Sequence, residues 1–261
     1  MEIIIQPDAK AGCEYASKLI SNLIKQKPNA VLGLATGGTP VPVYQSLIQK
    51  HKNEGLDFSK VKSFNLDEYI GIQPTHSASY QYYMKTNLFD HVNIRPENAK
   101  VPNGMASDIE AHCQDYEAQI KAAGGLDLQL LGIGGEGHIG FNEPSSSLAS
   151  RTRVKTLITR TREDNKRFFL PGEEVPHHVI TMGIGTIMEA RTIVLLAFGA
   201  SKAEAIAHSL EGPITSRIPA SILQMHPKTI VLLDEAAASK LEMADYYRHV
   251  YANKCDWQRV K

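Results

Sequence analysis

Residues 126–144, LDLQLLGIGGEGHIGFNEP, predict a buried strand followed by a glycine-rich loop. The apolar run 126–133 has the length of a buried strand, and the four glycines within 132–137 mark the loop that ends it. Glycines let the main chain turn and let its N–H groups approach a ligand closely. Because ligands of open α/β sheets bind at the carboxyl ends of the strands, we expect the active site in this loop.

Three ionisable side chains leave the same loop: Glu136, His138 and Glu143. Histidine titrates near neutrality, and a neighbouring carboxylate can fix its tautomer and raise its basicity. Pro144 disfavours the helical region for the residue before it and so keeps Glu143 in an extended segment. We therefore expect this cluster to move protons.

The glycines and ionisable groups of this loop allow three other interpretations. Residues 132–137 match the dinucleotide fingerprint GxGxxG, but the following IGFNEP cannot open a regular helix, and residues 151–155 are basic where that motif needs an acid, so we reject it. A metal site from Glu136, His138 and Glu143 stays open, although neither HExxH nor CxxC is present, and we expect no metal. A purely structural loop also stays open, although glycine-rich loops more often carry function.

Composition favours a globular protein with a small-molecule partner. The chain has 261 residues, of which 43% are hydrophobic, and 28 Lys plus Arg balance 28 Asp plus Glu, so no overall charge attracts nucleic acid or an anionic membrane. Cys13, Cys113 and Cys255 lie far apart and in no metal-ligand spacing, which is typical of free thiols in a reducing compartment. We find neither a signal-peptide pattern nor 18 consecutive apolar residues, and expect a soluble cytoplasmic protein.

Apolar segments of strand length alternate with amphipathic segments of helix length along the whole chain. This alternation predicts an α/β fold with a doubly wound, mostly parallel, Rossmann-like sheet flanked by helices, in one domain spanning residues 1–261. We expect strands at 3–5, 30–35, 61–66, 126–133, 154–158, 179–182, 192–198 and 229–234, and helices at 8–27, 41–50, 79–89, 108–123, 161–169, 203–210 and 241–251.

A second glycine turn follows the expected strand 30–35 and reads TGGTP, residues 36–40. Pro40 suits the first helical position and Thr39 the cap, which leaves backbone N–H groups free at the positive end of a helix. Phosphate would bind well there, although no Walker lysine follows and a simple tight turn stays open. Asp67 follows the strand 61–66 and would face the same crevice.

Seven basic residues between 151 and 167 are opposed by two acidic ones, Glu163 and Asp164. A solvated face would explain any single one of these bases. A phosphate ligand would account for several of them together. The bases are Arg151, Arg153, Lys155, Arg160, Arg162, Lys166 and Arg167.

Four blocks in this order resemble the glucosamine-6-phosphate deaminase family over nearly the whole chain. They are LGLATGGTP (32–40), FNLDEY (64–69), GHIGFNEP (137–144) and SRTRVKT (150–156). The resemblance implies an aldose-ketose isomerase and deaminase that converts glucosamine 6-phosphate and water to fructose 6-phosphate and ammonia in amino-sugar catabolism. It implies no cofactor.

The resemblance also assigns roles to residues. The proton-transfer carboxylate falls on Asp67, and the ring-opening histidine on His138, assisted by Glu143. Glu136 stands where the family commonly has Asp or Asn, one methylene longer, and we count it with the catalytic group. The phosphate-binding residues fall on Thr36, Gly37, Gly38, Thr39, Arg167 and Lys202.

Allosteric members of the family are hexamers that N-acetylglucosamine 6-phosphate activates by binding between subunits. The matching effector positions are present here as Ser146, Arg153, Lys155 and Thr156, although residues 246–248 depart from the usual pattern. The resemblance thus implies a homo-oligomer with this effector, and a mobile lid at about 153–182.

Two rival functions remain open. A 6-phosphogluconolactonase is similar in fold and has its own glycine-rich loop ending in Gly-His, but the blocks at 64–69 and 137–144 favour the deaminase. A sugar-phosphate sensor of a transcription regulator would need a DNA-binding segment, and the chain shows neither a basic arm nor a helix-turn-helix before residue 3.

Overall fold

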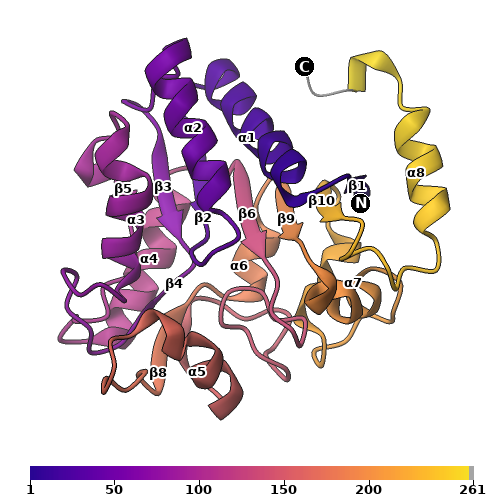
Figure 1. Ribbon diagram of the computed structural model, residues 1–261. Coiled ribbons are helices and arrows are strands. Elements are labelled where there is room, and N and C mark those ends of the chain that lie inside the picture. Colours follow the sequence, from indigo (N-terminus) through magenta and orange to yellow (C-terminus); the bar gives the residue numbers. More distant parts are fainter. Residues whose placement is uncertain (259–261) are drawn as a thin grey trace.

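The computed structural model describes residues 1–258, and its centre is a seven-stranded sheet (Figure 1). All neighbouring strands in this sheet are parallel, which confirms the doubly wound, mostly parallel architecture predicted from the sequence. In spatial order the strands are β1 (Glu2–Gln6), β10 (Thr229–Asp234), β9 (Ile193–Ala197), β6 (Leu128–Gly132), β2 (Val31–Leu34), β3 (Lys62–Asn65) and β5 (Ala99–Lys100).

The direction of winding reverses between β2 and β6. These strands are neighbours, with Leu32 opposite Leu128, yet the chain leaves β2 toward β3 on one side and leaves β6 toward β9 on the other. The two connections diverge at the carboxyl ends of the strands and leave a crevice there, which is where ligands bind in folds of this kind. The loops that follow β2 and β6 are the two glycine turns singled out in the sequence.

Helices cover both faces of the sheet (Figure 1). Alternate strand residues point to opposite faces, so that Ile4 packs with one helical layer and Ile3 with the other. Because both faces are covered, β9 and most of β10 are buried along their length. One layer holds α1 (Ala9–Gln26), α2 (Val41–Glu54) and α3 (Tyr80–Asn87); the other holds α4 (Ile109–Ala122), α6 (Ile184–Met188) and α7 (Ala203–Leu210).

The last helix, α8 (Ala244–Ala252), lies beside the edge strand β1, on the right of Figure 1. Its contacts include an edge-on approach of the Tyr251 ring to Tyr15, with ring centroids 6.4 Å apart. None of its residues is fully buried. The helix therefore covers the edge of the sheet rather than entering the core.

A second, antiparallel sheet lies beyond the carboxyl ends of the main strands, at the bottom of Figure 1. It consists of β4 (Asp67–Tyr69), β8 (His178–Thr181) and β7 (Arg153–Thr156), with α5 (Thr159–Asn165) between β7 and β8. The sequence analysis placed the segments 154–158 and 179–182 in the alternation of the main sheet, and this was wrong. Each is short, and after β7 the chain turns back through α5, so β8 runs in the opposite direction.

Several predicted boundaries also shift. Thr39 is not the cap of α2, because Pro40 takes that position without a side-chain cap. The analysis missed α6 and β5, which are too short for a clear periodic pattern. Short 3-10 helices complete the described chain: η1 (Phe89–His91), η2 (Pro96–Asn98), η3 (Lys166–Phe168), η4 (Ala200–Lys202), η5 (Pro219–Met225) and η6 (Asp256–Gln258).

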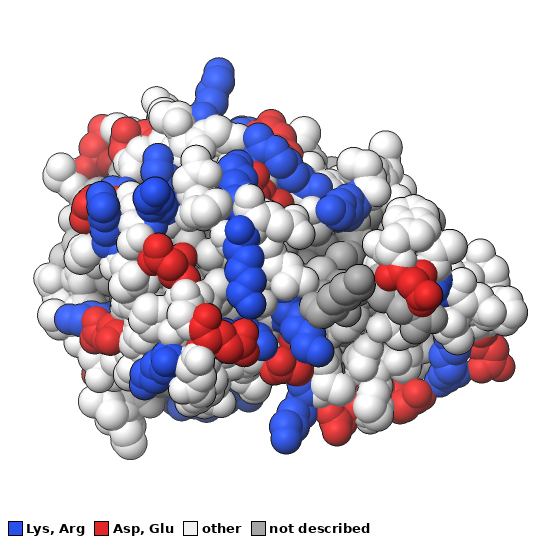
Figure 2. Space-filling model, turned by 90° about the horizontal axis from the view of Figure 1, so that it is seen from above, with Lys and Arg blue, Asp and Glu red and all other residues white. Residues whose placement is uncertain are grey.

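Charged side chains of both signs are interspersed over the face shown in Figure 2, which looks down on the molecule of Figure 1 from above. No large area of one sign stands out on this face, in keeping with the balanced composition. Among the described residues, no helix is both long and apolar enough to cross a membrane.

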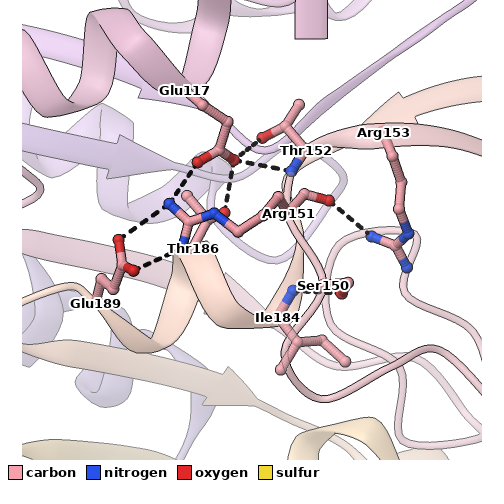
Figure 3. Close-up of polar contacts among 8 residues, drawn as sticks. All are labelled: Glu117, Ser150, Arg151, Thr152, Arg153, Ile184, Thr186 and Glu189. Carbon is pink, nitrogen blue, oxygen red and sulfur yellow. Dashed lines mark hydrogen bonds and ion pairs between the residues drawn. The ribbon is translucent and has the colours of Figure 1, made fainter. Parts of the chain in front are cut away.

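A polar cluster around Glu117 attaches α4 to the start of β7 and to α6 (Figure 3). The carboxylate of Glu117 accepts the Thr152 N–H at 2.8 Å and the Thr186 hydroxyl at 2.6 Å. Arg151 bridges Glu117 and Glu189, with a nitrogen 2.6 Å from each carboxylate. Burial raises the pKa of Glu117, but these hydrogen bonds and the Arg151 charge outweigh it, so the pKa lies below its ordinary value.

We expect Glu117→Ala to lower the free energy of unfolding by about 2–4 kcal/mol, because it leaves the Thr152 and Thr186 donors without their acceptor and removes one of the two carboxylates that pair with Arg151. Urea denaturation followed by circular dichroism measures this loss. Gln114→Ala, at an exposed position of the same helix, is the matched control and should stay within about 0.5 kcal/mol of wild type. An equal loss in both variants would contradict the role of the cluster.

Candidate active site

A cavity of about 310 Å³ opens at the carboxyl ends of β2, β3 and β6. Its lining comes from the loops after these strands, from α3 and the loop before it, and from α5, η3 and η4. It is lined by Ala35, Thr36, Gly37, Gly38, Thr39, Leu66, Asp67, Ser77, Ala78, Tyr80, Tyr83, Gly132, Ile133, Gly134, Gly135, His138, Gly140, Phe141, Thr161, Asp164, Asn165, Arg167, Phe168 and Lys202.

Most of the residues selected from the sequence meet in this cavity, although they come from distant parts of the chain. The cavity wall includes Thr36, Gly37, Gly38, Thr39, Asp67, His138, Arg167 and Lys202. The remaining two catalytic candidates and the four effector candidates do not line it; they are Glu136, Glu143, Ser146, Arg153, Lys155 and Thr156.

His138 is held against the glycine loop after β6. A β-carbon at Gly134 would lie 2.1 Å from the imidazole ring, so only glycine lets the ring take this place. The Gly134 N–H also donates to the His138 carbonyl at 2.9 Å. Burial, and then the positive charge of Lys202, lower the pKa of His138 to about 4. The imidazole is therefore neutral near pH 7 and able to accept a proton.

The two glutamates of the loop are engaged with the segment after β7. Glu136 forms an ion pair with Arg160 of α5 at 2.9 Å. Glu143 is 3% exposed, and both its oxygens lie 3.3 Å from the Ile158 N–H. Among residues 1–258, Nδ1 of His138 has no hydrogen-bond partner, so neither glutamate contacts it through that atom. Glu136 acts on His138 through its charge, which raises the pKa of the imidazole against the larger effect of burial.

Asp67 is buried at the start of β4, on the wall of the cavity. Burial, followed by repulsion from Glu68, raises the pKa of Asp67 to about 8. Glu68 is held next to it by the Ser79 hydroxyl at 2.7 Å and the Tyr80 N–H at 3.0 Å, at the amino end of α3. The Asp67 carboxyl can therefore gain or lose a proton near neutral pH.

Two cations, Lys202 and Arg167, line the cavity, and their charges act on one another. Burial is the main cause that lowers the pKa of Lys202, with Asp164 acting in the opposite direction and Arg167 in the same one. The guanidinium of Arg167 lies 4.8 Å from the centre of the Phe168 ring. These charges create an end of the cavity that suits an anion.

Three of the four effector candidates, Arg153, Lys155 and Thr156, lie on β7. Arg153 donates to the Asn142 side chain at 2.9 Å. It also donates to the Arg151 carbonyl at 3.2 Å (Figure 3). Because strand residues alternate, Lys155 shares the face of Arg153, whereas Thr156 lies on the other face. Ser146 is buried, and its hydroxyl has no partner within residues 1–258.

The sequence analysis missed cavity residues that have no motif of their own. Tyr80 and Tyr83 lie three residues apart on α3, which places them on one face of the helix. Asp164 and Asn165 line the cavity from α5. Their spacing indicates that the two tyrosines share one face of a helix. Only the position of α3 beside the loop after β2 shows that this face lines a ligand site.

The cavity thus contains the neutral imidazole of His138, the carboxyl of Asp67, which titrates near neutrality, and two cations. These groups are suited to proton transfer on a small anion. Within the described part of the chain, no group of three His, Cys, Asp or Glu side chains is placed to hold a metal ion.

The fold and the cavity define a doubly wound α/β protein with a proton-transfer site. The family model described as glucosamine-6-phosphate isomerases/6-phosphogluconolactonase matches residues 8–232, and the chain belongs to this family. It is 56% identical to a glucosamine-6-phosphate deaminase of Arthrobacter sp. (strain FB24), over 99% of each chain. A glucosamine-6-phosphate deaminase of Streptomyces coelicolor is 52% identical over 100% of each chain.

Two solved structures, one at high and one at low sequence identity, share this fold. A structure described as a monomeric glucosamine-6-phosphate deaminase superposes with a TM-score of 0.90 at 44% identity, over 92% of this chain and 100% of that one. A 6-phosphogluconolactonase from Trypanosoma brucei reaches a TM-score of 0.72 at 18% identity, over 92% of this chain and 98% of that one. The lactonase shares the fold alone.

We expect Asp67→Asn to stabilise the protein more at pH 8 than at pH 5. The pKa of Asp67 rises from 3.8 to about 8 on folding, so the unfolded state holds fewer protons in this window and wild-type stability falls as pH rises through it. The variant lacks this penalty and should melt roughly 5 °C or more above wild type at pH 8.

Calorimetry at the two pH values measures the difference, and Asp90→Asn, at an exposed position, should show none. A melting temperature that changes equally at pH 5 and pH 8 would mean that the Asp67 carboxyl is not the cause.

Proposed function

We propose that this protein is a glucosamine-6-phosphate deaminase, which converts glucosamine 6-phosphate and water to fructose 6-phosphate and ammonia. The observation that carries the proposal is the meeting of Asp67 and His138 with Lys202 and Arg167 in one cavity. The full-length similarity to proteins named glucosamine-6-phosphate deaminase supports it.

In the proposed reaction His138 opens the sugar ring. Its neutral imidazole accepts the proton of the hydroxyl at C1 and returns a proton to the ring oxygen. Asp67 then moves a proton from C2 to C1 through an enolamine, after which water replaces the amine at C2. The pKa of Asp67, about 8 in the free protein, falls when the substrate's ammonium group is bound beside it, which produces the carboxylate that this step needs.

The phosphate group would bind at the cationic end of the cavity. The residues that we assign to it are Thr36, Gly37, Gly38, Thr39, Arg167 and Lys202, all of which line the cavity. The loop after β2 offers N–H groups at the amino end of α2, where the helix dipole favours an anion. Anchoring the phosphate places C1 and C2 of the sugar beside His138 and Asp67.

Glu136 and Glu143 are proposed as positioning residues for His138. Glu143 holds the Ile158 N–H, and Glu136 holds Arg160, so both connect the catalytic loop to the segment over the cavity. The negative charge of Glu136 also makes the imidazole more basic.

Residues 153–182 would act as the lid within a single domain of residues 1–261. The segment supplies Thr161, Asp164 and Arg167 to the cavity wall, so a substrate can enter freely only when it moves. A hydrogen bond between His76 and Glu173 at 3.0 Å also connects the segment to the loop before α3. Ion pairs as exposed as that of Arg160 with Glu136 contribute little stability and can break easily.

We further propose that N-acetylglucosamine 6-phosphate activates a homo-oligomer of this protein, a hexamer if the response is allosteric. Arg153 and Lys155 share one face of β7 and could bind its phosphate, with the buried Ser146 hydroxyl as a further group. Exposed side chains near the carboxyl end, Tyr246 (57%) and Trp257 (80%), offer apolar surface for a neighbouring subunit.

The cytoplasm is the proposed compartment. Cys13, Cys113 and Cys255 are all unpaired, and the first two are buried. Free thiols of this kind persist in a reducing environment.

The decisive experiment is an assay of ammonia and fructose 6-phosphate formed from glucosamine 6-phosphate, with and without a chelator. Equal amounts of both products, unchanged by the chelator, are the expected result. Hydrolysis of 6-phosphogluconolactone instead, or binding of sugar phosphate without turnover, would contradict the proposal.

Asp67→Asn should lower kcat by about 10²–10⁴, because the variant has no carboxylate to move the proton, yet it should bind fructose 6-phosphate with a Kd within about threefold of wild type. Steady-state kinetics and isothermal titration calorimetry measure the two quantities, with Asp90→Asn as control. A variant that loses binding in proportion to its activity would show that Asp67 holds the substrate rather than moving the proton.

Wild-type protein should show a lower half-saturation concentration in the presence of N-acetylglucosamine 6-phosphate, and Lys155→Ala should lose most of this response. Lys52→Ala, an exposed lysine on α2, should keep it. Hyperbolic kinetics that the effector leaves unchanged, in a protein that light scattering shows to be a monomer, would refute both the effector and the oligomer.

A further inference from the structure

Alternate carbonyl groups of the loop after β2 are bound from outside the loop. The Tyr44 hydroxyl, from α2, donates to the Ala35 carbonyl at 2.5 Å. The Tyr83 hydroxyl, from α3, donates to the Gly37 carbonyl at 2.6 Å. The Cys13 thiol, from α1, lies 3.7 Å from the Thr39 carbonyl. Three helices of one layer thus fix the carbonyl groups of a single short loop.

Fixing a carbonyl also fixes the N–H group that follows it, because the two point in opposite directions across a planar trans peptide. The Thr36 N–H is therefore turned away from Tyr44, and the Gly38 N–H away from Tyr83. Within residues 1–258, no N–H group of residues 36–39 donates to a protein acceptor. The donors of the loop are left available to a ligand, while the carbonyls of Ala35, Gly37 and Thr39 are occupied.

The orientation of the Gly37–Gly38 peptide depends mainly on its hydrogen bond with Tyr83. Gly37 has a φ of +95°, and a β-carbon on either glycine would meet nothing within 4 Å, so packing does not hold this peptide. Two adjacent glycines can rotate the peptide between them at little cost. A rotated peptide would turn the Gly37 carbonyl oxygen, which carries a partial negative charge, toward the position of an anion.

We propose that Tyr83 is a positioning residue for substrate phosphate: its hydroxyl holds the Gly37–Gly38 peptide so that the Gly38 N–H faces the phosphate group. The inference rests on the proposed function, which places phosphate at this loop. Burial raises the pKa of Tyr83 well above its ordinary value, so the hydroxyl keeps its proton and donates at all working pH values.

The effect should appear in binding and not in chemistry. The phosphate group lies away from C1 and C2 and is held equally in the ground state and the transition state. Loss of such uniform binding raises KM and leaves kcat unchanged. A general loss of structure would instead lower kcat and the melting temperature as well.

The test is Tyr83→Phe, which keeps the ring and removes only the hydroxyl. We expect KM for glucosamine 6-phosphate and Kd for inorganic phosphate to rise about three- to tenfold, with kcat within about twofold of wild type. The Kd for unphosphorylated glucosamine should not change. Tyr82→Phe is the matched control, since Tyr82 is the neighbouring, exposed tyrosine of the same helix and should behave as wild type.

Wild-type affinity for inorganic phosphate in Tyr83→Phe would overturn the inference, as would a wild-type protein that does not bind phosphate. If wild type binds phosphate but does not turn over glucosamine 6-phosphate, the proposed function fails, and the phosphate affinities still decide the role of Tyr83. Tyr44→Phe provides a second variant with the same expectation for the Ala35–Thr36 peptide.

Discussion

The parallel pairing of β2 with β6 is the constraint on which the rest of the structure depends. Leu32 lies opposite Leu128, and from this pair the chain winds outward in both directions. Two glycine turns therefore emerge side by side at the carboxyl ends of these strands, one followed by α2 and the other containing His138. A crevice forms between them because the helices that follow must cover opposite faces of the sheet.

Burial is the main cause of the shifted pKa values in the site. Asp67 and His138 depart from their ordinary pKa values in opposite directions, the acid upward and the base downward, and removal from water is the main cause in both. Each group is therefore neutral near pH 7 in the free protein. A site of this kind favours proton transfer because neither group is committed to a charge before the substrate arrives.

The segment between β7 and β8 completes the wall of the site beyond the carboxyl ends of the main strands. It contributes Arg167 and Asp164 to the cavity, and it is attached to the rest of the protein through the small antiparallel sheet and the ion pair of Arg160 with Glu136. On either side of the small sheet, Glu117 accepts hydrogen bonds from Thr152, just before β7, and from Thr186, after β8. The segment itself is held by the Arg160 ion pair, by the Ile158 N–H on the buried Glu143 carboxylate, and by apolar packing of Phe169 on Tyr69.

The sequence by itself determined the parallel sheet, the two glycine turns, and the candidates Asp67 and His138 that line the cavity, because these depend on residue types and spacings within short segments. Arg167 and Lys202, which also line the cavity, were assigned to phosphate binding through the resemblance to the family. Only the tertiary structure decided that β7 and β8 form a separate antiparallel sheet, that Glu136 and Glu143 face the segment over the cavity, and that Tyr83 reaches Gly37. These features arise from contacts between segments tens of residues apart, where local spacing carries no information, and burial, which sets the pKa values, is a property of the assembled chain.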